Sequence, residues 1–192
     1  MMSTDQKPDA ASRLRSPLVI AGTIVLAAAV AAAQASLAAA VLRAVLVFVL
    51  VPCSVIDLER RIIPNRITGS GALVAIALGL ALDPGGEPQR LLWAGLAGGF
   101  LLIAALARPT GMGMGDVKLL GTMGLFLGRP VIIALLVALL GSVVAGVAIA
   151  SRVGVRSARK TGLPFGPYLA AGGIVAALIG AQIIHAYLNL HR

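Results

Sequence analysis

Charged residues are scarce in this sequence, which argues against the commonest classes of protein. They make up 12% of the 192 positions, about half the share carried by a soluble globular domain. Hydrophobic residues make up 59%, and the mean hydropathy is +0.98. These values argue against a soluble globule, a disordered chain and a nucleic-acid-binding domain. They indicate a protein that crosses a lipid bilayer several times.

Cysteine is nearly absent as well. Cys53 is the single cysteine, so neither an internal disulfide nor a CxxC metal site can form within this sequence. Cys53 precedes Asp57 by four positions, and buried packing is its favoured role. No other set of metal-ligating residues stands out, and we predict neither a metal nor a cofactor.

Long apolar runs separated by turn signals predict an all-α polytopic membrane protein with about six to seven transmembrane helices. Residues 17–56 carry one charge, Arg43, and a single helix of that length would measure about 60 Å, twice the hydrocarbon core. We therefore divide this run near Gln34-Ala35-Ser36. The predicted spans are 17–33, 38–57, 67–82, 90–107, the GMGMGD stretch to 128, 131–151 and 164–188.

The chain is interpreted as a single transmembrane domain, residues 17–192, preceded by a polar tail over residues 1–16. The tail is predicted to be disordered and cytoplasmic. A signal peptide is the alternative, because Arg13 and Arg15 precede an apolar run.

Lysine and arginine counts predict the orientation in the membrane. With the N-terminus in the cytoplasm, 12 of these residues fall on inside segments and 4 fall outside, as the positive-inside rule requires. This orientation places the segments DLERRIIPNR and GMGMGD and the loop 152–162 on the cytoplasmic face. The outside residues are Arg43, Arg90, Arg129 and Arg192.

Three acidic residues fall at the predicted cytoplasmic boundary of the membrane: Asp57, Glu59 and Asp116. A carboxylate at membrane depth costs a few kcal/mol and usually marks function. The alternative is a boundary residue that faces lipid headgroups, and position alone does not decide between the two. The other four acids fall in tails or outside turns, where exposure to solvent accounts for them: Asp5, Asp9, Asp83 and Glu87.

Asp116 ends the glycine-rich run GMGMGD. Alternating glycines are costly in a helix, but they allow another backbone or a substrate strand to approach closely, and they tolerate positive φ. We therefore expect Gly113 and Gly115 to shape the site. A carboxylate at the start of a helix is also favoured by the helix dipole. Lys118 could contact Asp116, a substrate carboxylate or, as we favour, lipid headgroups.

Two proline-containing segments flank the same boundary. Pro64 should end the helix that carries Asp57, because a proline disfavours helix at the preceding residue. Glu59 lies two positions from Asp57 and should point elsewhere, as a supporting or substrate-facing residue. Pro164, Gly166 and Pro167 predict either an irregular segment that lines a site or an ordinary proline-rich helix start.

Together these motifs resemble the bacterial type IV prepilin peptidases, which are membrane aspartic proteases with a GxGD motif. The matching segments occur in the family's order, and the resemblance covers about residues 40–190. They are the Asp-to-Asn segment at 57–65, GMGMGDVKLLGTMGLFLG at 111–128 and LPFGPYLAAGG at 163–173.

The resemblance implies an enzyme in the bacterial cytoplasmic membrane that cleaves the leader peptide of type IV prepilin-like proteins. It implies that Asp57 and Asp116 are the catalytic pair. Longer members carry paired CxxC motifs linked to N-methylation. With Cys53 alone, this sequence is similar to the short forms found with tight-adherence pilus systems, so methylation gains no support. The resemblance gives no oligomeric state.

Two close carboxylates suit this chemistry on physical grounds, because like charges resist double ionisation and the pair retains one proton. One carboxylate can then activate water while the other acts as an acid. Two alternatives remain open. One is a GxGD protease that cuts a different substrate within its transmembrane helix. The other is a non-enzymatic proton- or ion-coupled transporter, since transporters also carry intramembrane acids.

Overall fold

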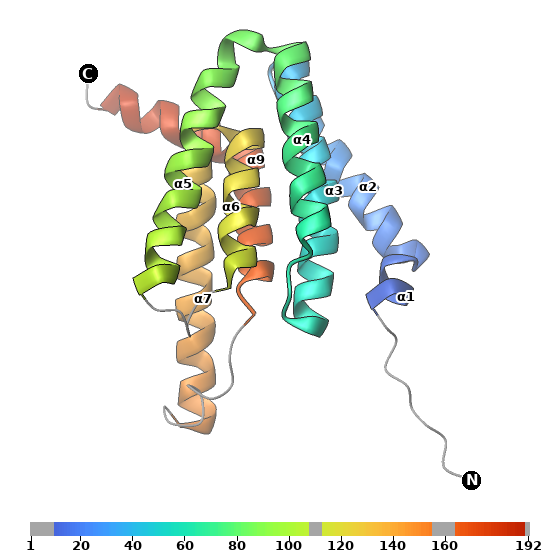
Figure 1. Ribbon diagram of the computed structural model, residues 1–192, viewed down its shortest axis with the longest axis vertical. Helices are drawn as coiled ribbons and strands as arrows, with labels where there is room; N and C mark the ends of the chain where they lie inside the picture. Colours follow the sequence, from blue (N-terminus) through green and yellow to red (C-terminus); the bar gives the residue numbers. More distant parts are fainter. Residues whose placement is uncertain (1–9, 108–112, 155–163, 191–192) are drawn as a thin grey trace.

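The computed structural model describes residues 10–107, 113–154 and 164–190, and these residues form a bundle of helices (Figure 1). Within these ranges the structure contains no β-strand. The elements are α1 (Ala10–Leu14), α2 (Pro17–Ala32), α3 (Leu37–Arg60), α4 (Asn65–Leu82), a 3₁₀ turn η1 (Pro84–Gly86), α5 (Glu87–Ala107), α6 (Met114–Leu127), α7 (Val131–Val153) and α9 (Gly166–Leu190).

The all-α, multi-pass prediction is confirmed. Among the described residues, five segments are long and apolar enough to cross a membrane: α3, α4, η1 with α5, α7 and α9. The other two predicted spans are helical but shorter. The apolar helix α2 has 16 residues, and α6 has 14, which gives α6 a length of about 21 Å at 1.5 Å per residue.

Serine caps explain where the first long apolar run divides. The Ser16 hydroxyl accepts a hydrogen bond from the backbone N–H of Val19 at 3.3 Å, at the start of α2. The Ser36 hydroxyl accepts one from the N–H of Ala39 at 3.2 Å, at the start of α3. A capped N-terminus satisfies backbone donors that a helix otherwise leaves free. The predicted break at residues 34–36 is therefore confirmed.

The tail was predicted to be disordered over residues 1–16, and this prediction is wrong for residues 10–14, which form α1. The short helix is held against α3 by an ion pair between Arg13 Nε and Glu59 Oε1 at 3.0 Å. Residues 1–9 lie outside the described part of the chain.

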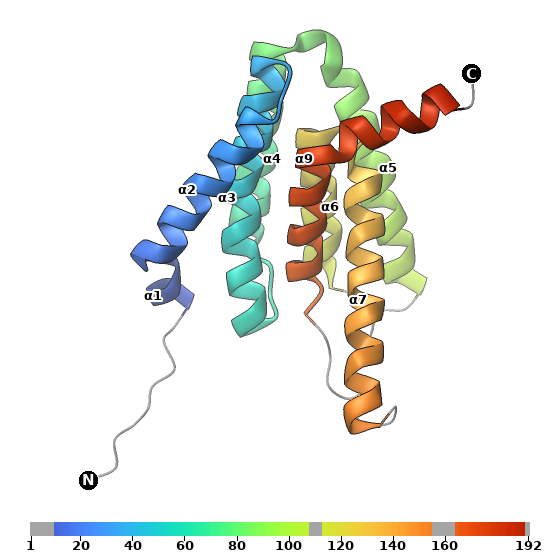
Figure 2. The same cartoon turned by 180° about the vertical axis from the view of Figure 1, so that it is seen from behind.

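The short helix α6 occupies the centre of the bundle (Figures 1 and 2). Nearly all of its residues from Asp116 to Leu127 are buried, as expected for a helix with neighbours on every side. Leu50 of α3 and Met123 of α6 both pack against Gly173 of α9, where a Cβ would lie 2.7 Å from Leu50 Cδ1. Three helices distant in sequence therefore meet at one point in the core.

This packing brings the C-terminal end of α3 and the N-terminal ends of α6 and α9 to one end of the bundle (Figures 1 and 2). The turn that joins α4 to α5 lies at the opposite end. The C-terminal part of α9 also lies there, and it turns away from the axis of the other helices.

Candidate active site

Asp57 lies in the last turn of α3 and is 5% exposed. Arg61 ends this helix in the left-handed conformation, with φ 53°, and its backbone N–H donates to the Asp57 carbonyl at 2.9 Å. Pro64 then caps the start of α4. The prediction that the helix ends before Pro64 is confirmed, and the chain reverses direction just after the carboxylate.

The start of α9 contacts Asp57 directly. The backbone N–H of Gly166 donates to Asp57 Oδ2 at 2.9 Å, and a Cβ at position 166 would lie only 2.7 Å from that oxygen. Pro164 precedes the helix and Pro167 is its second residue. Glycine is required here because the backbone itself approaches the carboxylate. This contact orients Asp57 and aims the positive end of the α9 dipole at it.

Asp116 lies in the first turn of α6, as predicted, and is 8% exposed. Its backbone N–H donates to the Gly113 carbonyl at 3.1 Å, which closes the first turn. Gly113 caps the helix with extended backbone. Gly111 and Met112 lie outside the described residues.

The Asp57 and Asp116 carboxylates lie near enough for their charges to repel each other. They come from different helices, and each is buried by protein. Like charges brought near each other in a buried site resist double ionisation, so such a pair can hold one proton between its two members. The structure therefore brings together the two acids that the sequence singled out, in an arrangement suited to acid–base chemistry.

Gly115 lets the start of α6 pack against the connection between α3 and α4. A Cβ at position 115 would lie 2.8 Å from Ile63 Cβ, and Ile63 is buried. The predicted role in close approach is thus supported. Tolerance of positive φ is not the reason for glycine here, because Gly115 is helical and the described glycines with positive φ are Gly128 and Gly154.

The two candidate substrate-facing residues make other contacts. Glu59 pairs with Arg13. Lys118 is exposed, and its Nζ donates to Asn65 Oδ1 at 2.9 Å, which links α6 to α4. Cys53 is fully buried, consistent with its predicted packing role. In the part of the chain that the structure describes, no group of three His, Cys, Asp or Glu residues could hold a metal ion.

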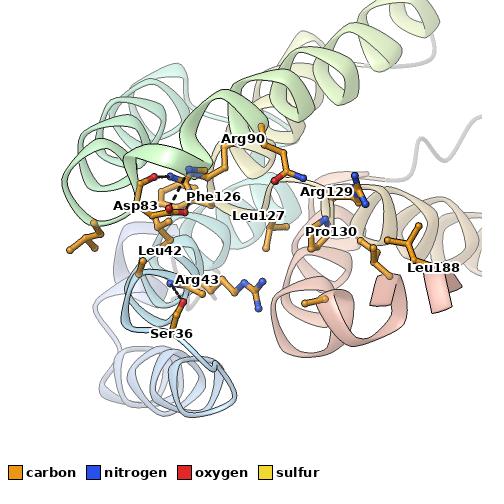
Figure 3. Close-up of a pocket in the computed structure, with 18 residues that line it drawn as sticks. Ser36, Leu42, Arg43, Asp83, Arg90, Phe126, Leu127, Arg129, Pro130 and Leu188 are labelled. Atoms are coloured by element: carbon orange, nitrogen blue, oxygen red, sulfur yellow. Dashed lines mark hydrogen bonds and ion pairs between the residues drawn. The ribbon is translucent and has the colours of Figure 1, made fainter. Parts of the chain in front are cut away.

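Sequence reasoning missed a charge network of Asp83, Glu87 and Arg90 at the opposite end of the bundle. Figure 3 shows its Asp83–Arg90 part. Glu87 was expected to be solvated but is 3% exposed, because Arg90, itself 8% exposed, pairs with it and keeps it buried. Arg90 lies 2.9 Å from Glu87 Oε2 and 2.7 Å from Asp83 Oδ2. The hydrogen bond from Arg90 lowers the pKa of the Asp83 carboxyl. The helical spacing of Glu87 and Arg90 was the available signal.

Comparison with known proteins identifies related sequences. Residues 44–151 match the type IV leader peptidase family. A prepilin leader peptidase/N-methyltransferase of Bacillus subtilis (strain 168) is 34% identical over 153 residues, which cover 76% of this chain and 58% of that protein. The protein of the same name from Aeromonas salmonicida (strain A449) is 31% identical over 191 residues, covering 94% and 63%.

A third such protein, from Pseudomonas aeruginosa, is 32% identical over 181 residues, which cover 91% of this chain and 62% of that protein. The chain therefore spans about three fifths of the length of these relatives. No solved structure matches the chain significantly.

Proposed function

Because this chain belongs to the type IV leader peptidase family, we propose that it is an aspartic endopeptidase that removes the leader peptide of type IV prepilin-like proteins. The observation that carries the proposal is the buried pair of Asp57 and Asp116, which come from separate helices. The relatives whose names include prepilin leader peptidase support the substrate class.

The pair performs hydrolysis by general acid–base catalysis. The ionised carboxylate accepts a proton from water as the water attacks the scissile carbonyl. The protonated carboxyl polarises that carbonyl and then gives its proton to the departing amine. The backbone N–H of Gly166 holds Asp57 in place during these transfers. Which carboxyl carries the proton is a property of the pair rather than of one residue.

The position of the pair suits a substrate with an apolar helix behind its cleavage point. The five long apolar helices make the chain a multi-pass membrane protein. In the orientation predicted from the lysine and arginine counts, the pair lies at the cytoplasmic face of the bacterial inner membrane. The substrate's helix would lie in the bilayer, and the junction with its leader would then reach the pair.

The test is co-expression with a prepilin-like precursor, followed by mass determination of the precursor's N-terminus. We expect leader removal by the unchanged enzyme, and losses of at least about 10²–10⁴-fold with Asp57→Asn or Asp116→Asn, because each removes a proton-transfer group. Immunoblotting of membranes controls for insertion. A fully active Asp57→Asn variant would refute the proposal that the two aspartates are the catalytic pair. Cleavage inside the substrate's apolar helix would instead indicate an intramembrane protease.

A further inference from the structure

A cavity of about 620 Å³ opens at the end of the bundle opposite the aspartate pair. Its walls come from the starts of α3, α5 and α7, the ends of α4 and α6, and the C-terminal part of α9. Three arginines line it: Arg43, Arg90 and Arg129 (Figure 3). These three residues are distant in sequence, and the fold brings them to one cavity.

Only Arg90 of these three has a carboxylate partner among the described residues. Asp83 and Glu87 both pair with it, and its Nη2 also donates to the Asp83 carbonyl at 2.6 Å. The charge of Arg90 is therefore neutralised by its own partners, and its role in the cavity is structural.

Arg43 is half-buried, and its partners are neutral. Its Nη1 donates to Gln34 Oε1 and to the Ala177 carbonyl, the latter at 3.3 Å. Nη2 and Nε donate to no described residue, so they remain available to a ligand. Removing a charge from water without an opposite charge is costly. The surroundings of Arg43 therefore favour an anion in the cavity.

Arg129 forms the second free charge. Its guanidinium lies 5.9 Å from the centre of the Trp93 ring, and none of the carboxylates in the described ranges forms an ion pair with it. Arg43, on α3, and Arg129, in the turn before α7, both line the cavity, from different sides (Figure 3). Two guanidinium groups that face one cavity suit a phosphate, because each offers several donors in a planar fork.

Besides the arginines, Ser36, Asp83 and Gln89 line the cavity, and the remaining wall is mostly apolar. It includes Leu42, Phe126, Ile184 and Leu188. A free inorganic anion gains nothing from such a wall, whereas a phospholipid can place its phosphate against the arginines and its glycerol and upper acyl chain against these side chains. The C-terminal part of α9 turns away from the bundle axis at this end (Figure 2), as a helix at the surface of a bilayer would.

We propose that this cavity binds the phosphodiester headgroup of a phospholipid in the membrane leaflet opposite the aspartate pair, with Arg43 and Arg129 contacting the phosphate. The proposal is independent of the peptidase activity. The bound lipid would contact the N-terminal ends of α3 and α7 and the C-terminal part of α9, and would stabilise their packing.

The test is native mass spectrometry of the purified full chain in detergent with added dioleoylphosphatidylglycerol. We expect discrete lipid adducts, reduced at least tenfold in the variant R43Q/R129Q. Arg152→Gln is the matched control, because it removes the same charge from an exposed position at the other end of α7 and should leave the adducts unchanged. Dioleoylglycerol, which lacks phosphate, should not bind.

Two further measurements test the proposal if the double variant does not fold or if a free anion binds instead of a lipid. Arg129→Gln alone, at a half-buried surface position, should reduce the adducts even where the double variant fails to fold. Inorganic phosphate at millimolar concentration should not displace the lipid, and displacement would indicate a free-anion site instead. Adducts of equal abundance in the unchanged protein and in a folded Arg129→Gln variant would overturn the proposal.

Discussion

At the scale of single residues, the site depends on contacts that allow almost no added volume. The Asp57 carboxylate has a backbone segment, not a side chain, as its neighbour, and Gly166 provides that segment. A side chain at this position would occupy the space where the carboxylate lies. The most sensitive position beside the acids is therefore a residue with no chemistry of its own.

We predict that Gly166→Ala lowers cleavage about 10²-fold while the protein still inserts, because the new Cβ would displace Asp57 and small misplacements of a catalytic group have effects of that size. The measurement is specific activity per inserted molecule. The matched control is Gly146→Ala in α7, where a Cβ meets nothing within 4 Å. Equal activity of the two variants would contradict the role of this contact.

At the scale of elements, the start of α6 is positioned by the connection between α3 and α4. Gly115 packs on Ile63, and the Lys118–Asn65 and Thr122–Thr68 hydrogen bonds continue the same contact along α6 and α4. Asp116 is therefore placed relative to Asp57 by how closely these elements approach.

Gly115→Val should reduce cleavage severely, because even its Cβ would lie 2.8 Å from Ile63 Cβ and the added bulk would push α6 away from Ile63. Gly113→Ala should be milder, since its Cβ would lie 3.4 Å from Asp116 Oδ2, an ordinary contact distance. Activity per inserted molecule is the measurement for both. If both variants retained the activity of the unchanged protein, the proposed role of Gly115 would be wrong.

At the scale of the whole molecule, the two ends of the bundle use charge differently. One end buries two carboxylates, Asp57 and Asp116, near enough for their charges to interact. At the other end, where α4 is followed by α5, Glu87 and Arg90 are buried and Arg90 also pairs with the half-exposed Asp83. A buried pair contributes little net stability, but removing one partner leaves a costly unpaired charge.

We predict that Arg90→Gln lowers the free energy of unfolding by about 3–5 kcal/mol, because Glu87 would remain buried without its counter-ion. Glu87→Gln/Arg90→Gln should lose less than Arg90→Gln alone, since the double variant buries no charge. Thermal unfolding in detergent measures both. Additive losses would mean that the two side chains act independently.

The sequence by itself determined the helical segments, their breaks and the candidate acids, because these follow from local properties: apolar run length, serine caps, prolines and the rarity of carboxylates. The distances among those segments are not local. Only the tertiary structure brought Gly166 to Asp57, Ile63 to Gly115 and Arg43 to the cavity of Arg129. It also buried Glu87 where the sequence predicted solvent, because burial depends on which helices pack around a residue and not on its neighbours in the chain.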